Sequence, residues 1–194
     1  MSFNKILYVT TQLTGTWRYF SWCAYPNIWY ARLQRKIINL LEKKENIEFF
    51  VKFYPNDYVT NPNLFFAKSN SFKMLNEPLV DILEREHFDL IITEACATTL
   101  LEILCTTSQV LVLAHKDFIK LRGESLKILS KRVFVVESEK SYIDFISNFL
   151  SLDYFVSFKE INDEFLFTYG IEAPLQKSEK QASIYINKIL ESLS

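Results

Sequence analysis

Short, continuously apolar runs alternate along this chain with segments of helical periodicity, and this alternation constrains the fold more than any other feature. Leu90-Ile91-Ile92 and Val110-Leu111-Val112-Leu113 are typical of strands buried on both faces, as in a parallel sheet covered by helices. The predicted strands cover residues 5–11, 47–53, 71–75, 89–93, 110–114 and 133–136. The predicted helices cover residues 26–41, 77–86, 98–105, 117–131, 139–151 and 179–193. We therefore expect an α/β fold.

The bulk composition favours one globular domain over residues 1–194. A hydrophobic content of 49% argues against disorder, and no internal repeat or flexible linker divides the chain. The net charge of −1 lacks the positive excess of a general nucleic-acid binder, so we expect no nucleic-acid partner. An anionic ligand would have to be held by local dipoles and a few cations.

The cysteine, histidine and glycine content excludes several kinds of site. Three cysteines without paired spacing and two separate histidines predict neither a disulfide framework nor a metal site. Three glycines are too few for a glycine-rich phosphate loop or a dinucleotide fingerprint, and we expect no cofactor. No signal peptide and no apolar run of the ~18 residues that span a membrane are evident. We therefore expect a cytoplasmic protein with reduced thiols.

Ligands of open parallel sheets bind beyond the carboxyl ends of the strands, near helix N-termini. Four predicted loops lie at that edge, and a site should draw on them. They cover residues 11–25, 54–70, 93–99 and 115–122.

The start of the helix predicted over residues 98–105 is the first candidate. Thr98, Thr99 and Glu102 share roughly one helical face, where hydroxyls and amides could hold a diphosphate and the carboxylate a ribose diol. The alternative is a capping box, in which Thr99 caps the helix and Glu102 folds back onto the cap amide.

Three further groups are candidates for phosphate contacts. Lys52, followed by Tyr54, could aim its ammonium at a phosphate, or could extend to solvent from an edge strand. The turn Thr14-Gly15-Thr16 could cradle a phosphate through backbone amides, or could belong to a loop whose aromatics cover apolar surface. His115 and Lys116 follow a buried strand on the ligand side, where His115 could be a phosphate contact, a general base or a structural residue.

Four motifs taken together resemble the nucleotide-sugar-binding C-terminal half of GT-B glycosyltransferases. The resemblance extends over about residues 5 to 150. It is nearest to the polysialyltransferase-like and CDP-glycerol glycerophosphotransferase-like enzymes of bacterial surface carbohydrates. The motifs are Lys52-Phe53-Tyr54-Pro55, Asp89-Leu90-Ile91-Ile92-Thr93-Glu94, Thr98-Thr99-Leu100-Leu101-Glu102 and Val110-Leu111-Val112-Leu113.

The resemblance implies a fold and a set of roles. The fold is a Rossmann-like doubly wound sheet, mostly parallel, with about six strands and helices on both faces. Thr98 and Thr99 would contact the donor phosphates, Glu102 the ribose, and Lys52 would lie beside the phosphates. Tyr54 stands where the family has a histidine, and a tyrosine supplies no imidazolium charge. The helix predicted over residues 179–193 would play the closing role of the family's C-terminal helix.

We expect a donor-binding domain for a nucleotide sugar or a CDP-linked alcohol, inactive in transfer without an N-terminal acceptor domain or a partner chain. Two alternatives stay open. One is a flavodoxin-like FMN-binding domain that uses the aromatic loop after the first strand. The other is a non-catalytic interaction domain that presents Phe65-Phe66 or the aromatics of residues 17–29 to a partner, and a homo-oligomer is compatible with it.

Overall fold

The computed structural model describes residues 5–13, 27–44, 47–55, 61–65, 72–117, 121, 123–149 and 159–170. The strands are β1 (Lys5–Val9), β2 (Glu48–Lys52), β3 (Lys73–Leu75), β4 (Leu90–Thr93), β5 (Gln109–Leu113) and β6 (Phe134–Val136). The helices are α1 (Asn27–Leu41), α2 (Leu79–Arg85), α3 (Thr98–Leu104), α4 (Gly123–Arg132), α5 (Glu139–Phe149) and α6 (Glu164–Tyr169), with a 3-10 helix η1 (Pro62–Phe65).

The six strands form one sheet in the order β3-β2-β1-β4-β5-β6, and every neighbouring pair is parallel. This is the order of a Rossmann-like doubly wound fold, and it differs from the flavodoxin order 2-1-3-4-5. The chain winds outward from β1 in one direction, then returns to β4 and winds in the other. The predicted fold class is confirmed.

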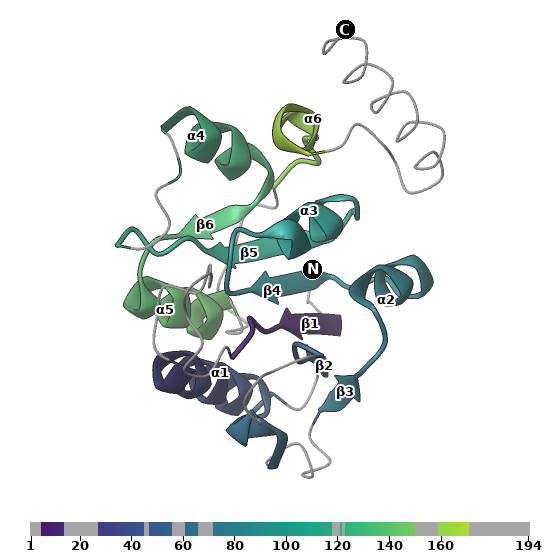
Figure 1. Ribbon diagram of the computed structural model, residues 1–194, viewed down its shortest axis with the longest axis vertical. Coiled ribbons are helices and arrows are strands. Elements are labelled where there is room, and N and C mark those ends of the chain that lie inside the picture. Colours follow the sequence, from purple (N-terminus) through teal and green to yellow (C-terminus); the bar gives the residue numbers. More distant parts are fainter. Residues whose placement is uncertain are drawn as a thin grey trace, which may run out of the picture.

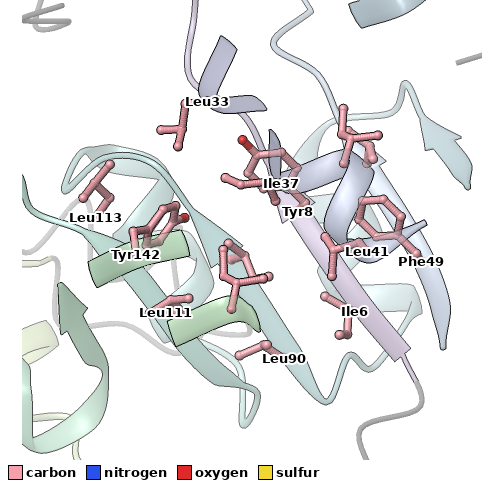
Figure 2. Packing of buried hydrophobic residues seen from close by; sticks show 14 of the residues in the cluster. Ile6, Tyr8, Leu33, Ile37, Leu41, Phe49, Leu90, Leu111, Leu113 and Tyr142 are labelled. Atoms are coloured by element: carbon pink, nitrogen blue, oxygen red, sulfur yellow. The ribbon is translucent and has the colours of Figure 1, made fainter. Parts of the chain in front are cut away.

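One face of the sheet packs against α1 and α5, which lie next to each other (Figure 1). The strands contribute alternate residues to this layer, such as Ile6 and Ile92, because successive side chains of a strand point to opposite faces. Leu33, Ile37 and Leu41 recur at helical spacing along α1 and meet them. Figure 2 shows this cluster, in which two tyrosines, Tyr8 and Tyr142, lie among aliphatic side chains.

The opposite face packs against α2, α3, α4 and α6. It receives the other set of strand residues, including Leu7, Ile91 and Val112. The helices contribute Ile82, Leu100, Ile103, Ile128, Leu129 and Phe165. Both faces of the central strands are therefore covered, which explains why these strands are apolar throughout.

The largest boundary error is at α4, one predicted loop contains a short 3-10 helix, and one predicted element is not covered. The helix expected over residues 117–131 begins at Gly123. Glu124 lies in its first turn, where a negative charge interacts favourably with the positive end of the helix dipole. The loop expected over residues 57–70 contains η1. The helix predicted over residues 179–193 lies outside the described residues. None of the described helices has the length and apolar character that crossing a membrane requires.

Candidate functional site

The strand order reverses between β1 and β4, so the loops that follow these strands diverge to opposite faces of the sheet. In doubly wound sheets, ligands bind beside such a reversal at the carboxyl edge, the edge at which the parallel strands end, and we refer to this part of the edge as the crevice. Lys52, Val9, Thr93 and Val112 lie side by side at this edge. Neighbouring strands are spaced by about 4.8 Å, which puts the backbones of Lys52 and Thr93 roughly 10 Å apart. Three of the four predicted binding groups, those that follow β2, β4 and β5, therefore lie along this edge of the sheet.

Helix α3 begins at Thr98 on the β4 side of this crevice. The residue before it, Ala97, is extended and forms the N-cap, and no side chain donates or accepts a capping hydrogen bond there. The capping-box alternative is therefore wrong for Thr99 and Glu102. The methyl side chain of Ala97 cannot accept a hydrogen bond, so no cap side chain accepts from the first-turn amides.

The two threonines and the glutamate of α3 differ in burial. Thr98 is exposed, whereas Thr99 and Glu102 are half-buried. Burial raises the pKa of the Glu102 carboxyl above its ordinary value. Burial also raises the pKa of the neighbouring Cys96 thiol to about 12, so this thiol is a poor nucleophile at neutral pH.

Lys52 ends β2, which lies between β3 and β1 and is not an edge strand. The residue is 5% exposed, and its ammonium donates a hydrogen bond of 3.2 Å to the carbonyl of Phe53. The alternative of a lysine extending to solvent from an edge strand is therefore wrong. Burial lowers the pKa of Lys52, and the nearby charge of Glu77 opposes that shift. Tyr54 follows at the same edge and is 41% exposed.

His115 and Lys116 follow β5 at the same edge, separated from its last residue by Ala114. The ring of His115 is half-buried and meets Trp29 edge-on, with 6.2 Å between ring centroids. Lys116 is exposed, and its amide donates to the carbonyl of Glu137. An exposed lysine and a packed imidazole therefore follow each other beyond β5.

A buried polar cluster on the β1 side of the crevice was not predicted from the sequence. Glu94 is 2% exposed, and its carboxyl group accepts hydrogen bonds from the Tyr8 hydroxyl, the Thr11 amide and the Gln34 side-chain amide. The signal for it was a set of polar residues inside otherwise apolar patterns, with Tyr8 in β1 and Gln34 in α1. Burial and, to a lesser extent, the charge of Glu94 hold the pKa of Tyr8 well above its ordinary value.

The turn Thr14-Gly15-Thr16 lies outside the described residues, as do the aromatics Trp17, Tyr19, Phe20 and Trp22 of the same loop. The Phe65-Phe66 side chains lie outside them too. Within the described parts of the chain, no group of three or more histidine, cysteine or acidic side chains could hold a metal ion.

No protein-family model matches this chain, and no curated protein sequence matches it. Among solved structures, the chain is similar to the NMR solution structure of ALG13. The TM-score is 0.50 and the sequence identity 11%, and the match covers 88% of this chain and 96% of ALG13. At this identity the likeness concerns the fold, and it extends over almost the whole of both chains.

Proposed function

We propose that this chain is the donor-binding domain of a transferase that uses a nucleotide sugar or a CDP-linked alcohol in bacterial surface-polysaccharide assembly. One observation carries the proposal. The strand order brings the ends of β2, β4 and β5, with Lys52, Thr98 and His115 close behind them, to the edge where the sheet reverses. Nucleotide ligands of doubly wound sheets bind at this kind of crevice.

The similarity to ALG13 supports the fold on which the proposal rests. The motifs of this chain resemble the nucleotide-sugar-binding half of GT-B enzymes, and this resemblance supports a nucleotide-linked donor.

The proposed contacts follow from the chemistry of a pyrophosphate. The backbone amides and side-chain hydroxyls of Thr98 and Thr99 donate to phosphate oxygens, while Lys52 and Lys116 approach from the strands on either side. Glu102, one turn deeper in α3, accepts hydrogen bonds from the ribose hydroxyls. As the bond to the diphosphate breaks, fixed amides and cations stabilise the negative charge of the leaving group.

The β1 side of the crevice is less suited to a phosphate. Glu94 accepts the amide hydrogen of Thr11 at 2.8 Å, so this amide at the root of the loop does not point to a ligand. A carboxyl group at that root would also oppose an approaching anion. We therefore place the diphosphate on the α3 side, in contrast to FMN binding at the first loop of a flavodoxin-like domain.

Transfer would require a second component. The proposed contacts account for the donor, and we propose that an acceptor-binding domain or a partner chain supplies the acceptor site and the catalytic base. Tyr54 stands where the GT-B enzymes that this chain resembles have a histidine. A tyrosine can donate one hydrogen bond but supplies no positive charge near neutral pH.

A thermal-shift screen against UDP-, CMP-, CDP- and GDP-linked ligands tests the proposal. A ligand at a hundredfold excess over its dissociation constant stabilises the folded chain by about 2.7 kcal/mol. Thr99→Ala and Glu102→Ala should lose most of this stabilisation. Thr168→Ala on α6 and Glu84→Ala on α2, both exposed, are matched controls that should keep it. No response to any ligand, or equal responses from all four variants, contradicts the proposed site.

A further inference from the structure

The carboxyl group of Glu94 joins two strands, a loop and a helix at the crevice. One oxygen accepts from the Tyr8 hydroxyl of β1. The other accepts from the Thr11 amide at 2.8 Å and from the Gln34 side chain of α1 at 3.1 Å. Gln34 also donates to the carbonyl of Thr11 at 3.4 Å, so both backbone polar groups of Thr11 meet this cluster.

The cluster continues from Gln34 into η1. The side-chain oxygen of Gln34 accepts a hydrogen bond from the Asn61 side-chain amide at 2.9 Å. The Asn63 side-chain amide donates a hydrogen bond to a backbone carbonyl of α1 at 3.0 Å. Asn61 and Asn63 are themselves buried. A polar cluster that is satisfied this completely holds its members in one arrangement, because every alternative leaves a buried donor without an acceptor.

The residues after Thr11 carry this anchoring across the edge of the sheet. Leu13 is buried against Tyr30 and Ala31 of α1, with Trp29 packed beside them. Trp29 in turn meets the ring of His115, which follows β5. An unbroken series of contacts therefore leads from Glu94 beyond β4, through residues 11–13 and α1, to His115 beyond β5.

We propose that Glu94 is a positioning residue for the crevice, which fixes the backbone at Thr11 and, through Leu13 and Trp29, the placement of His115. The side chain faces inward, away from an incoming donor, and acts on the site through the groups that it holds. Its effect on donor binding rests on the proposed function, whereas the anchoring of Thr11 does not.

Two variants of Glu94 separate anchoring from bulk. Glu94→Met keeps an unbranched side chain of similar length but offers no acceptor to Thr11. Glu94→Gln can turn its amide oxygen toward Thr11 and Gln34, while the Tyr8 hydroxyl accepts from the new amide group. Tyr142→Phe is the matched control, because Tyr142 is a fully buried tyrosine of the same core whose hydroxyl donates to the carbonyl of Thr93 at 2.8 Å.

Hydrogen exchange and NMR on the full chain give the readouts. We expect Glu94→Met to accelerate exchange of the Thr11 amide by about tenfold or more, and Glu94→Gln to restore most of the protection. The ring protons of His115 should shift in the Met variant, whereas those of His87 should not. His87, the second of the two histidines, lies between α2 and β4 at the opposite edge and serves as an internal control. Tyr142→Phe should leave the Thr11 amide unchanged.

Each outcome decides the inference. Unchanged Thr11 exchange in Glu94→Met, or a wild-type Thr11 amide that exchanges like an unprotected one, overturns it. If the Met variant does not fold, Glu94→Asp replaces it, since one methylene fewer withdraws the carboxyl from Thr11. Protection must then fall, and unchanged protection overturns the inference.

Donor binding is measured separately by titration with the UDP-, CMP-, CDP- and GDP-linked ligands. We expect the folded Met variant to bind about tenfold more weakly than wild type, and Tyr142→Phe to bind equally well. A wild-type chain that binds none of these ligands contradicts the proposed function, while the Thr11 and His115 measurements still decide the anchoring. Equal affinities of wild type and the Met variant overturn the positioning role toward the donor.

Discussion

Two junctions lie next to each other at the carboxyl edge of the sheet, and they treat their polar groups in opposite ways. After β1, the backbone of Thr11 is held by Glu94 and Gln34 in a buried cluster. After β4, helix α3 begins behind Ala97 without a side-chain cap. The first junction uses its polar groups within the protein, and the second leaves its first-turn amides unclaimed by a cap.

This difference indicates where a ligand can gain binding energy. A ligand that approached Thr11 would have to replace bonds that the protein already makes, which gives little net gain. A ligand at Thr98 would supply acceptors that no cap side chain supplies. Four sets of substitutions test this contrast, in order from the largest expected effect to the smallest.

The largest effect should come from Glu94→Met. Loss of the carboxyl group leaves the Tyr8 hydroxyl, the Thr11 amide and the Gln34 side chain without their shared acceptor, which should lower the free energy of unfolding by about 3 kcal/mol or more. Chemical denaturation measures it. Glu137→Met, at an exposed glutamate that follows β6 at the same edge, should change stability by about 0.5 kcal/mol or less. Similar losses in the two variants would show that the buried cluster contributes nothing special.

Lys52→Met should stabilise the chain and weaken donor binding. Burial lowers the pKa of Lys52 from 10.5, so the unfolded chain binds more protons between the lowered value and 10.5. Wild-type stability should therefore rise as the pH increases through this window, and the variant should lack that rise. Chemical denaturation of wild type and variant at neutral and at alkaline pH measures these stabilities. A variant that is less stable at neutral pH would indicate that the lysine serves the fold.

Alanine at Thr98 or Thr99 should change stability by only about 0.5 kcal/mol or less, because neither residue caps α3. Ser138 provides the comparison. Its hydroxyl accepts the Ser141 amide at 3.2 Å before α5, so Ser138→Ala should cost about 1 kcal/mol. Thermal unfolding of the three variants measures the difference. A loss at Thr99 as large as that at Ser138 would restore the capping interpretation.

The smallest effect should come from Glu102→Gln. Burial raises the pKa of Glu102 above 4.5, so the folded chain binds more protons than the unfolded chain just above pH 4.5. Wild type therefore loses some stability as the pH rises through this window. The variant should be slightly more stable than wild type at pH 7, by about 0.5 kcal/mol or less, and equal to it below pH 4.5. A gain that persists in acid would need another cause.

The sequence predicted the sheet because its signal is local. Runs such as Ile6-Leu7 and Val110-Leu111-Val112 are apolar on both faces, and only a sheet covered on both sides buries them. The start of α3 at Thr98 was predicted for the same kind of reason. What the sequence could not decide was the capping of that helix, since Thr99 and Glu102 have the right spacing for a capping box but lie two positions too late.

The Glu94 cluster could not be predicted because its members are far apart in the sequence. Tyr8 and Glu94 are separated by 86 positions and Gln34 and Glu94 by 60, and only the parallel pairing of β1 and β4 brings their ends together. Local patterns carry no information about such a meeting. The burial of Lys52 was missed for a related reason, since it depends on β3 lying outside β2 in the sheet.

The most direct test of the central claim is an NMR titration of the ¹⁵N-labelled full chain with UDP, CDP and GDP. We predict that one of these nucleotides shifts the amides of Thr98 and Thr99 most strongly, while the amide of Thr11 keeps its position and its slow exchange. Shifts centred on Thr11 to Leu13, with Thr98 and Thr99 unmoved, would contradict it.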